Sequence, residues 1–339
     1  MKRESILYEV LGDKEVRCNT CQRRCKISDG KMGWCMTREN EGGTLYSRIY
    51  GEVSSLSINP IEKKPVFHFY PGTKWLSLGS VGCNFRCPGC QNWSIAHWKE
   101  GPMYTQYVSP EELVSRAKTL GCKGISWTFN EPALWLEYTL DAALLARAKG
   151  LYTNYVTNGF ITEEAFDRIA PFLDVYRVDI KGFSDRTYQK VAGIKGFKGI
   201  LKVAEKAKKC GMHVEIVTNI IPGFNDSQAE LKGIASWIKE KLGQDTPWHV
   251  TGFHPHCDLV HLQPTPISDL ENAWSIGKEE GLWYVYLGNV PGHNLENTYC
   301  HICGEPLIER DIFDIIENRI KYGRCPECKA EIPGRFEET

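Results

Sequence analysis

Short apolar runs recur along the middle of the chain and alternate with longer segments that have the pattern of helices. The runs are rich in β-branched and aromatic residues and cover positions 75–79, 123–129, 151–157, 174–180, 213–220, 248–253 and 283–287. Because they show no polar alternation, they indicate parallel strands that are buried on both faces. Helices are predicted between them, at 133–149, 163–172 and 201–211.

Two helix starts can be located more closely. Ser109 and Glu112 frame a capping box with Pro110 at the first helical position, directly before LVSRAKTL. Ser268 and Glu271 frame a second capping box before AWSIGKEEG. We therefore expect one helix to begin at each serine.

Six or seven strand–helix units in series predict an α/β protein with a parallel sheet, curled as a full or partial (β/α) barrel. Cysteine sets lie outside this pattern, near both ends of the chain. We predict an N-terminal four-cysteine cap at 1–50, the barrel at 51–291, and a zinc-ribbon or rubredoxin-like module at 292–339.

Polar residues collect where the predicted strands end. In open and closed α/β sheets, ligands bind at the carboxyl ends of the strands. The residues that follow successive strands there are Asn130, Glu131, Thr157, Asn158, Asp179, Lys181, Asn219 and His254. Packing alone explains this gathering poorly, so the sequence predicts a binding site at this edge of the sheet.

Charge and hydropathy narrow the choice of partners. The chain has 339 residues, a net charge of −1 and a pI near 6.8, which gives no electrostatic footprint for nucleic acid or an anionic membrane. No apolar run approaches the roughly 18 residues of a membrane span, and the N-terminus lacks a signal core. We expect a soluble cytoplasmic protein without nucleic-acid or membrane partners.

Cysteine is the residue type that changes the picture most. Cytosolic thiols are kept reduced, so disulfides explain the 14 cysteines poorly, whereas C-x2-C spacing is typical of metal sites. Eleven cysteines fall into three sets, which are Cys18/Cys21/Cys25/Cys35, Cys83/Cys87/Cys90 and Cys300/Cys303/Cys325/Cys328.

The central set is one ligand short of a closed site. Cys83, Cys87 and Cys90 have the spacing C-x3-C-x2-C and follow the first predicted strand. A structural zinc site closes at four ligands, and no fourth cysteine lies near. A [4Fe–4S] cluster held by three cysteines keeps one iron open for an outside ligand. A zinc knuckle or a loop of free thiols is the alternative.

This loop resembles the signature of the radical S-adenosylmethionine (radical SAM) superfamily. The resemblance implies that SAM chelates the open iron and that an electron, from an electron donor, breaks its sulfonium–carbon bond. The resulting 5′-deoxyadenosyl radical abstracts hydrogen from a substrate. The residue before the third cysteine is often aromatic in the superfamily but is Gly89 here. Phe85 and Trp93 are then the candidates to stack on adenine.

The same resemblance implies roles for the residues at the strand ends. Asn130 and Glu131 stand where related enzymes carry a Gly-Gly-Glu-Pro-like turn that meets the SAM amino group. Thr157 and Asn158 match a T-N-G motif near methionine and ribose. Asp179 and Lys181 resemble a D-x-K motif whose lysine could hold the SAM carboxylate, and His254 in F-H-P-H stands where that family places a SAM-binding histidine. Asn219 and His254 could reach ribose or carboxylate. Another metal site at His256, Cys257 and His261 is disfavoured, because histidines at strand ends more often bind substrate.

The two terminal cysteine sets each offer four thiolates. At Cys300, Cys303, Cys325 and Cys328 we expect structural zinc, with a rubredoxin-like iron as the alternative. For Cys18, Cys21, Cys25 and Cys35 the sequence leaves zinc and an auxiliary iron–sulfur cluster equally open.

Nearly the whole chain resembles the radical SAM member of the AmmeMemoRadiSam system, proteins once labelled pyruvate formate-lyase activating enzyme homologues. The segments that carry the resemblance are CNTCQRRCKISDGKMGWC, NPIEKKPVFHFYPG, GCNFRCPGCQNWSI, TFNEPALWLEY and GNVPGHNLENTYC. It implies Memo-like and AMMECR-like partners. Gly252 replaces an arginine of the expected R-F-x-P pattern, which puts a SAM or substrate contact in doubt.

Three classes of function remain. The first is an enzyme that acts on a small molecule or lipid precursor, and the second is an activase that installs a glycyl radical on a partner enzyme. The third is an interaction protein that bound metal ions stabilise and that catalyses no reaction. Such a protein does not need an open cluster, so the three-cysteine loop weighs against this class. The extra cysteine sets weigh against an activase, so we expect the first class.

Overall fold

The computed structural model describes residues 2–99 and 104–337 of the chain. The chain divides into two compact units. Unit 1 comprises Met1–Asn59, Lys74–Tyr176 and Gly196–Met212, and unit 2 comprises Pro60–Thr73, Arg177–Lys195 and His213–Thr339. The division into a cap, a barrel and a terminal module stays a prediction.

The main sheet has eight strands in the order β16-β15-β14-β13-β12-β11-β9-β8. These strands are β8 (Ser55–Pro60), β9 (Lys74–Gly79), β11 (Gly124–Trp127), β12 (Tyr152–Thr157), β13 (Val175–Asp179), β14 (His213–Ile220), β15 (Trp248–Gly252) and β16 (Val285–Gly288). All seven predicted runs are strands, and the mixed α/β class with a parallel sheet is confirmed. The edge strand β8 was not predicted.

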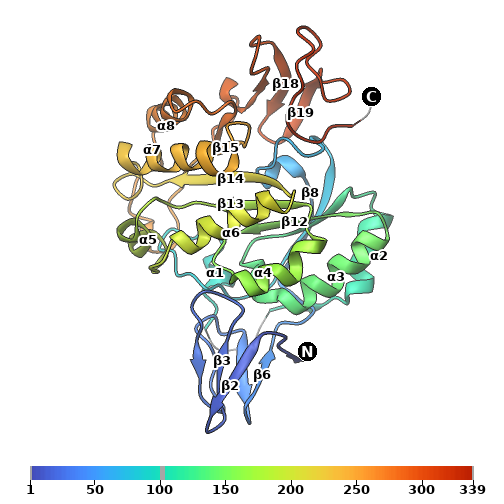
Figure 1. The fold of residues 1–339 in the computed structure, drawn as a ribbon, viewed down its shortest axis with the longest axis vertical. Helices are drawn as coiled ribbons and strands as arrows, with labels where there is room; N and C mark the ends of the chain where they lie inside the picture. Colours follow the sequence, from blue (N-terminus) through green and yellow to red (C-terminus); the bar gives the residue numbers. More distant parts are fainter. Residues whose placement is uncertain (1, 100–103, 338–339) are drawn as a thin grey trace. The chain divides into compact units, whose positions relative to one another are not determined.

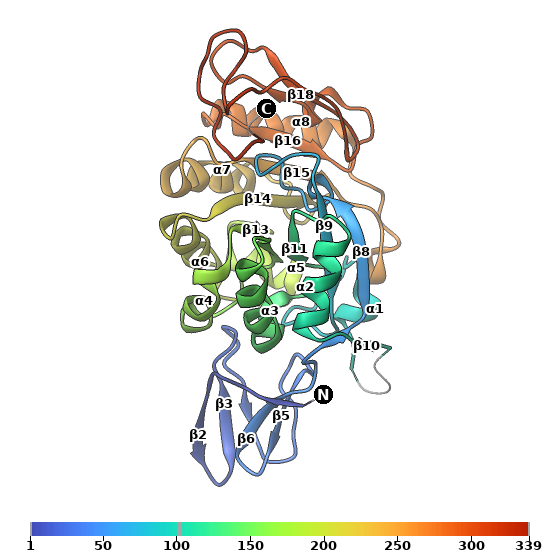
Figure 2. The ribbon, with the colours of Figure 1, turned by 90° about the vertical axis from the view of Figure 1, so that its right-hand side faces the viewer.

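In unit 1, parallel pairing joins β9, β11 and β12, with Gly124 opposite Trp75 and Tyr152. A Cβ on Gly124 would lie 2.4 Å from the Trp75 ring and from the Tyr152 carbonyl oxygen, so only glycine fits. Helices cover this part of the sheet (Figures 1 and 2). They are α2 (Pro110–Thr119), α3 (Leu136–Ala148), α4 (Glu163–Ile169) and α6 (Lys198–Lys209), with the short α1 (Trp93–Ala96), η2 (Pro132–Trp135) and η3 (Ala170–Phe172).

One of the two predicted helix starts is wrong. The Ser109 hydroxyl accepts a hydrogen bond from the backbone N–H of Glu112 at 3.1 Å, which confirms the first capping box. Helix α8 (Ile267–Glu279) instead begins after Pro266, and no side chain caps it. Ser268 lies inside the first turn, because the chain already enters helical geometry one residue earlier.

The N-terminal part of unit 1 consists of two small antiparallel sheets and a two-stranded pair. Their orders are β2-β3-β4, β1-β6-β5 and β10-β7. The strands are β1 (Arg3–Glu4), β2 (Tyr8–Gly12), β3 (Glu15–Cys18), β4 (Lys26–Ile27), β5 (Arg38–Glu41), β6 (Thr44–Ser47), β7 (Glu52–Val53) and β10 (Gln106–Tyr107). A buried ion pair of 2.6 Å between Arg38 and Glu137 ties this part to α3.

In unit 2, parallel pairing joins β14, β15 and β16. The elements around them are η1 (Ile61–Lys63), α5 (Asp185–Ala192), α7 (Gln228–Trp237), the π-helical η4 (Ile238–Leu242), η5 (Cys257–Leu259), α8 and η6 (Asn294–Glu296). A terminal antiparallel sheet contains β17 (Thr298–Tyr299), β18 (Pro306–Asp311) and β19 (Asp314–Asn318). Cys300 and Cys325 share a hydrophobic core with Tyr284, Tyr286 and Leu307.

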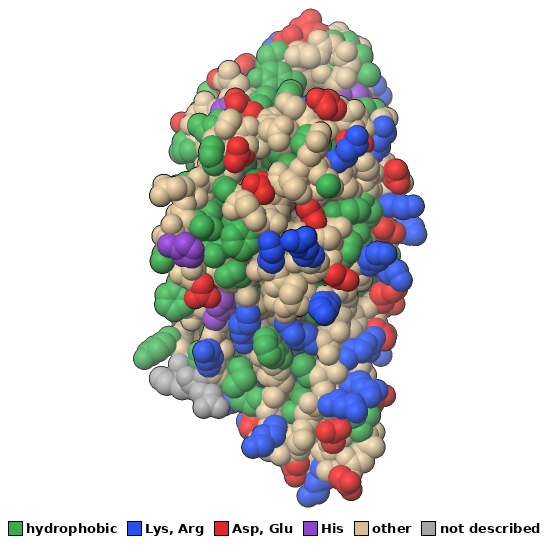
Figure 3. All heavy atoms as spheres, turned by 90° about the vertical axis from the view of Figure 1, so that its left-hand side faces the viewer, with side chains coloured by type: hydrophobic (Ala, Val, Ile, Leu, Met, Phe, Trp, Pro, Cys, Tyr) green, Lys and Arg blue, Asp and Glu red, His purple; other side chains and the backbone are tan. Residues whose placement is uncertain are grey.

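Charged side chains of both signs are interspersed on the face drawn in Figure 3, as the net charge of −1 leads one to expect. Among the described residues, no helix combines the length and apolar character needed to cross a membrane.

Candidate functional site

The three-cysteine loop joins β9 to α1 and is fastened by asparagine side chains near both ends. Asn130 accepts a hydrogen bond from Ser80 N at 3.0 Å and donates to Gly82 O at 3.0 Å. At the other end, Asn92 Nδ2 donates to the carbonyl oxygen of Phe129 at 2.8 Å. The turn at 129–130 therefore fixes the entry and the exit of the cysteine loop.

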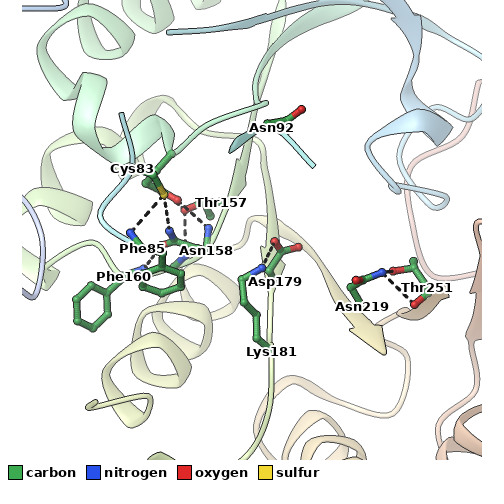
Figure 4. Close-up of polar contacts among 12 residues, drawn as sticks. Cys83, Phe85, Asn92, Thr157, Asn158, Phe160, Asp179, Lys181, Asn219 and Thr251 are labelled. Carbon is green, nitrogen blue, oxygen red and sulfur yellow. Dashed lines mark hydrogen bonds and ion pairs between the residues drawn. The ribbon is translucent and has the colours of Figure 1, made fainter. Parts of the chain in front are cut away.

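Cys83 is held in place by hydrogen bonds to its sulfur. Its Sγ accepts from Phe85 N at 3.4 Å and from Asn158 Nδ2 at 3.7 Å (Figure 4). Burial raises the pKa of the Cys83 thiol, and the Glu131 carboxylate raises it further. Cys83, Cys87 and Cys90 are all partly exposed, so an iron cluster bound by them can still meet an outside ligand.

Glu131 organises the residues around Cys83. It is 1% exposed, and its oxygens accept from the Thr157 hydroxyl at 2.7 Å, Asn158 N at 2.8 Å and Ala133 N at 3.0 Å. These bonds join the turn after β11 to the T-N-G segment after β12. The arrangement presents the Asn158 amide to the Cys83 sulfur.

The two aromatic candidates for adenine differ in exposure. Phe85 is 1% exposed, and its ring centroid lies 5.5 Å from that of Phe160. Trp93, at the start of α1, is 50% exposed. Phe85 therefore belongs to the core behind the loop, and Trp93 is the candidate that still has a free face.

In unit 2, Asp179 at the end of β13 forms ion pairs with Lys181 at 2.9 Å and with Arg177. Burial raises the pKa of Asp179, but the two cations outweigh it and hold the pKa below its usual value. The sequence pattern singled out Asp179 and Lys181 but missed Arg177, which also projects on that face because it precedes Asp179 by two residues.

The two other predicted residues of unit 2 differ in their surroundings. Asn219 Nδ2 donates to Thr251 Oγ1 at 3.1 Å and to Gly252 O at 2.9 Å, so it links the ends of β14 and β15. The side chain of His254, just after β15, is exposed. Exposure leaves its imidazole able to contact a ligand.

The C-terminal cysteines form a compact site. The four Sγ atoms all lie within 4.8 Å of one another, with Cys300 and Cys328 3.5 Å apart and Cys303 and Cys325 3.7 Å apart. A tetrahedral ion with bonds of about 2.3 Å separates its sulfurs by about 3.8 Å. The predicted knuckles therefore come together in a geometry that can hold one metal ion.

The N-terminal cysteines are also brought together, but more widely. Cys18, Cys21, Cys25 and Cys35 line one pocket of unit 1, which also includes Arg23 and Arg38. Sequence reasoning missed these arginines, as well as Asn84 and Asn92. Their spacing carries no motif, and the contacts that define them join positions far apart in the chain.

Comparison with known proteins assigns the class. Residues 78–238 match the family described as the Radical SAM superfamily. An uncharacterized protein of Methanocaldococcus jannaschii is 44% identical over 332 residues, which cover 97% of this chain and 98% of that protein. The chain belongs to the radical SAM superfamily and is an enzyme of that class.

Two further matches are an activating enzyme and a solved structure. The pyruvate formate-lyase-activating enzyme of Clostridium pasteurianum is 27% identical over 191 residues, covering 52% of this chain and 75% of that enzyme. The crystal structure of Streptococcus suis SuiB bound to S-adenosylmethionine matches with a TM-score of 0.51 at 13% identity, covering 71% of this chain and 56% of that one. The second match supports the predicted fold only.

Proposed function

We propose that Cys83, Cys87 and Cys90 hold a [4Fe–4S] cluster whose open iron binds SAM. When bound, the cluster supplies the electron that cleaves SAM to methionine and a 5′-deoxyadenosyl radical, which abstracts hydrogen from a substrate. The observation that carries the proposal is the set of three partly exposed thiols on a loop that the 129–130 turn anchors at both ends.

The chain's own residues have separable tasks. Asn158 donates a hydrogen bond to the Cys83 sulfur, and Glu131 holds Asn158 and Thr157 in position. A carboxylate can accept further hydrogen bonds. We therefore propose that Glu131 also accepts one from the SAM amino group. In unit 2 we propose Lys181 for the SAM carboxylate, since its ammonium is already oriented by Asp179. Asn219 and His254 are proposed for ribose or carboxylate.

The direct test is SAM cleavage. Anaerobic, reconstituted and reduced protein should release 5′-deoxyadenosine when SAM is added, and Cys87→Ala should release none. Cys210→Ala is the matched control, because Cys210 is an exposed cysteine outside the three sets. A fully reconstituted wild-type protein that releases no 5′-deoxyadenosine would refute the proposal.

For the C-terminal set we propose zinc in a structural role. Four thiols at tetrahedral separations, two of them buried in the core of the terminal sheet, support a closed site. Metal analysis distinguishes zinc from a single iron ion in the same geometry. Absorption spectroscopy gives a second readout, because thiolate-bound iron absorbs visible light and thiolate-bound zinc does not.

A second candidate function is activation of a glycyl-radical enzyme. The observation in its favour is the similarity to an activating enzyme from Clostridium pasteurianum. An activase generates a stable glycyl radical on a partner, so a doublet EPR signal on the partner would support it. Memo-like and AMMECR-like proteins are our proposed partners, and co-purification with the full chain tests that association.

A further inference from the structure

The four N-terminal cysteines line a pocket that differs in geometry from the C-terminal site. The pocket lies between β3, β4 and the segment before β5. A compact metal site needs at least three potential ligands whose donor atoms all lie within 4.8 Å of one another. Among the described residues, only the C-terminal cysteines form such a group. The sulfurs of Cys18, Cys21, Cys25 and Cys35 are therefore spread more widely.

This spread discriminates between a single ion and a cluster. One zinc ion draws four sulfurs to about 3.8 Å from one another, as in the C-terminal set. In a cubane cluster each cysteine binds a different iron, which places the sulfurs further apart. Among the described residues, the sulfurs of the loop cysteines Cys83, Cys87 and Cys90 also do not all lie within 4.8 Å of one another.

The walls of the pocket suit an anionic, water-sensitive group. Arg38 is 1% exposed, and its Nε has no hydrogen-bond partner among the described residues although it lies in the pocket wall. Sulfurs of a cluster accept such N–H bonds. Ile27, Trp34 and Leu134 supply apolar lining on the other sides.

We propose that Cys18, Cys21, Cys25 and Cys35 bind a second [4Fe–4S] cluster, with the Arg38 Nε–H directed at it. Because each of the four irons would carry a cysteine, no iron is open to a substrate. We therefore infer the role of this cluster from the residues that surround the pocket.

The neighbours connect this pocket to the loop that carries Cys83. Asn84 lines the pocket, directly follows Cys83 in the chain, and receives a hydrogen bond from Asn158 at 2.8 Å. Arg23 donates to the Asn84 carbonyl oxygen at 2.6 Å. Arg23 lines the pocket between Cys21 and Cys25 in the chain, so its side chain links the N-terminal set to the residue that follows Cys83.

This proximity gives the second cluster the role of a one-electron relay, a role that rests on the function proposed for Cys83. A ferredoxin- or flavodoxin-type protein donates one electron and reduces the N-terminal cluster from the 2+ to the 1+ state. That electron then passes to the cluster on Cys83, which goes from 2+ to 1+ while its donor returns to 2+. No proton or bond changes hands in the transfer.

Metal analysis of a full-length variant tests the site independently of catalysis. In Cys83→Ala/Cys87→Ala/Cys90→Ala, the N-terminal pocket is untouched. After anaerobic reconstitution it should retain about four iron and about four sulfide per chain, with a reducible [4Fe–4S] EPR signal. Adding Cys18→Ala and Cys21→Ala should remove this iron and sulfide, whereas adding Cys210→Ala should not. A triple variant that holds a second zinc, or no sulfide, overturns the proposal.

The relay is tested by changing the electron source. With Cys18→Ala/Cys21→Ala, release of 5′-deoxyadenosine should fall about tenfold or more with a reduced ferredoxin but stay within about twofold of wild type with dithionite. An equal effect, or none, with both reductants overturns the relay. If wild type releases no 5′-deoxyadenosine with either reductant, the proposed function fails, while the iron and sulfide content of the triple variant still decides the site.

Discussion

Amide side chains do much of the positioning around the cysteine loop. Asn130 and Asn92 hold its backbone, and Asn158 reaches the Cys83 sulfur. An amide has both donors and acceptors, so one asparagine can bind a carbonyl oxygen and an N–H at once. Each of these contacts joins segments more than 30 residues apart in the chain.

Asn158→Leu keeps the size of the side chain but removes its N–H donor. Because hydrogen bonds to cysteine sulfur raise the reduction potential of a cluster, we expect a more negative midpoint potential for the Cys83 cluster. A shift on the order of 60 mV corresponds to a tenfold change in the reduction equilibrium. An EPR-monitored redox titration measures it, with iron content as the control. An unchanged potential would show that the contact at Cys83 does not tune the cluster.

Glu62 is a buried acid whose ionisation opposes folding. It is 1% exposed, Gly72 N donates to its Oε1 at 2.9 Å, and its Oε2 has no hydrogen-bond partner among the described residues. Burial raises the pKa of Glu62 from 4.5 to about 7. The folded protein therefore holds this proton where the unfolded chain has lost it, and stability falls as pH rises from about 4.5 to 7.

Glu62→Gln should remove this dependence. By linkage the variant gains about 3 kcal/mol relative to wild type between pH 4.5 and 8. The measurement is the difference between the two proteins' thermal midpoints at several pH values, which cancels the titration of other groups. A difference that stays constant with pH would contradict the raised pKa.

At the scale of elements, the strands were predicted well and one helix start was not. Residues in β11 and β15 are buried throughout, which is what their unbroken apolar runs indicated. The second capping box failed since its pattern, Ser268 followed by Glu271, also fits the interior of a first turn. Hydrogen bonding, rather than residue type, decides which serine caps a helix.

Ser109→Ala and Ser268→Ala form a matched pair. The first removes the acceptor for Glu112 N and should cost about 1 kcal/mol of stability. The second removes an exposed hydroxyl that caps nothing and should change stability by less than about 0.5 kcal/mol. Chemical denaturation of both variants measures the contrast. Equal effects would mean that the cap at Ser109 contributes nothing special.

At the scale of the whole molecule, cysteines of both terminal sets form part of the hydrophobic clusters. Cys300 and Cys325 are buried among the hydrophobic residues of the terminal sheet, so the metal ion proposed for them and that core would depend on one another. Small knuckle modules gain most of their folding free energy from the bound ion.

Cys325→Ala should therefore lose the proposed zinc and unfold the terminal sheet. We expect amide hydrogens of β18 and β19 to exchange rapidly in the variant while those of β11 and β12 stay protected. Zinc content and hydrogen exchange by mass spectrometry measure the two effects, with Cys210→Ala as the control. Retained protection in β18 without zinc would show that the core suffices.

The sequence by itself determined the features that are local in the chain. Apolar runs gave the seven strands, and the spacing of Cys83, Cys87 and Cys90 gave the superfamily, because a strand or a metal-binding loop is encoded within a few consecutive residues. The C-terminal knuckles were equally readable from their spacing.

Only the tertiary structure decided which distant residues surround those loops and how widely their sulfurs are spaced. The Asn158–Cys83 contact, the buried Arg38 and the separation between the N-terminal sulfurs depend on segments that meet only after folding. Cysteine spacing left zinc and a cluster equally open at Cys18, Cys21, Cys25 and Cys35. The choice between them depends on distances in space, which spacing along a chain does not specify.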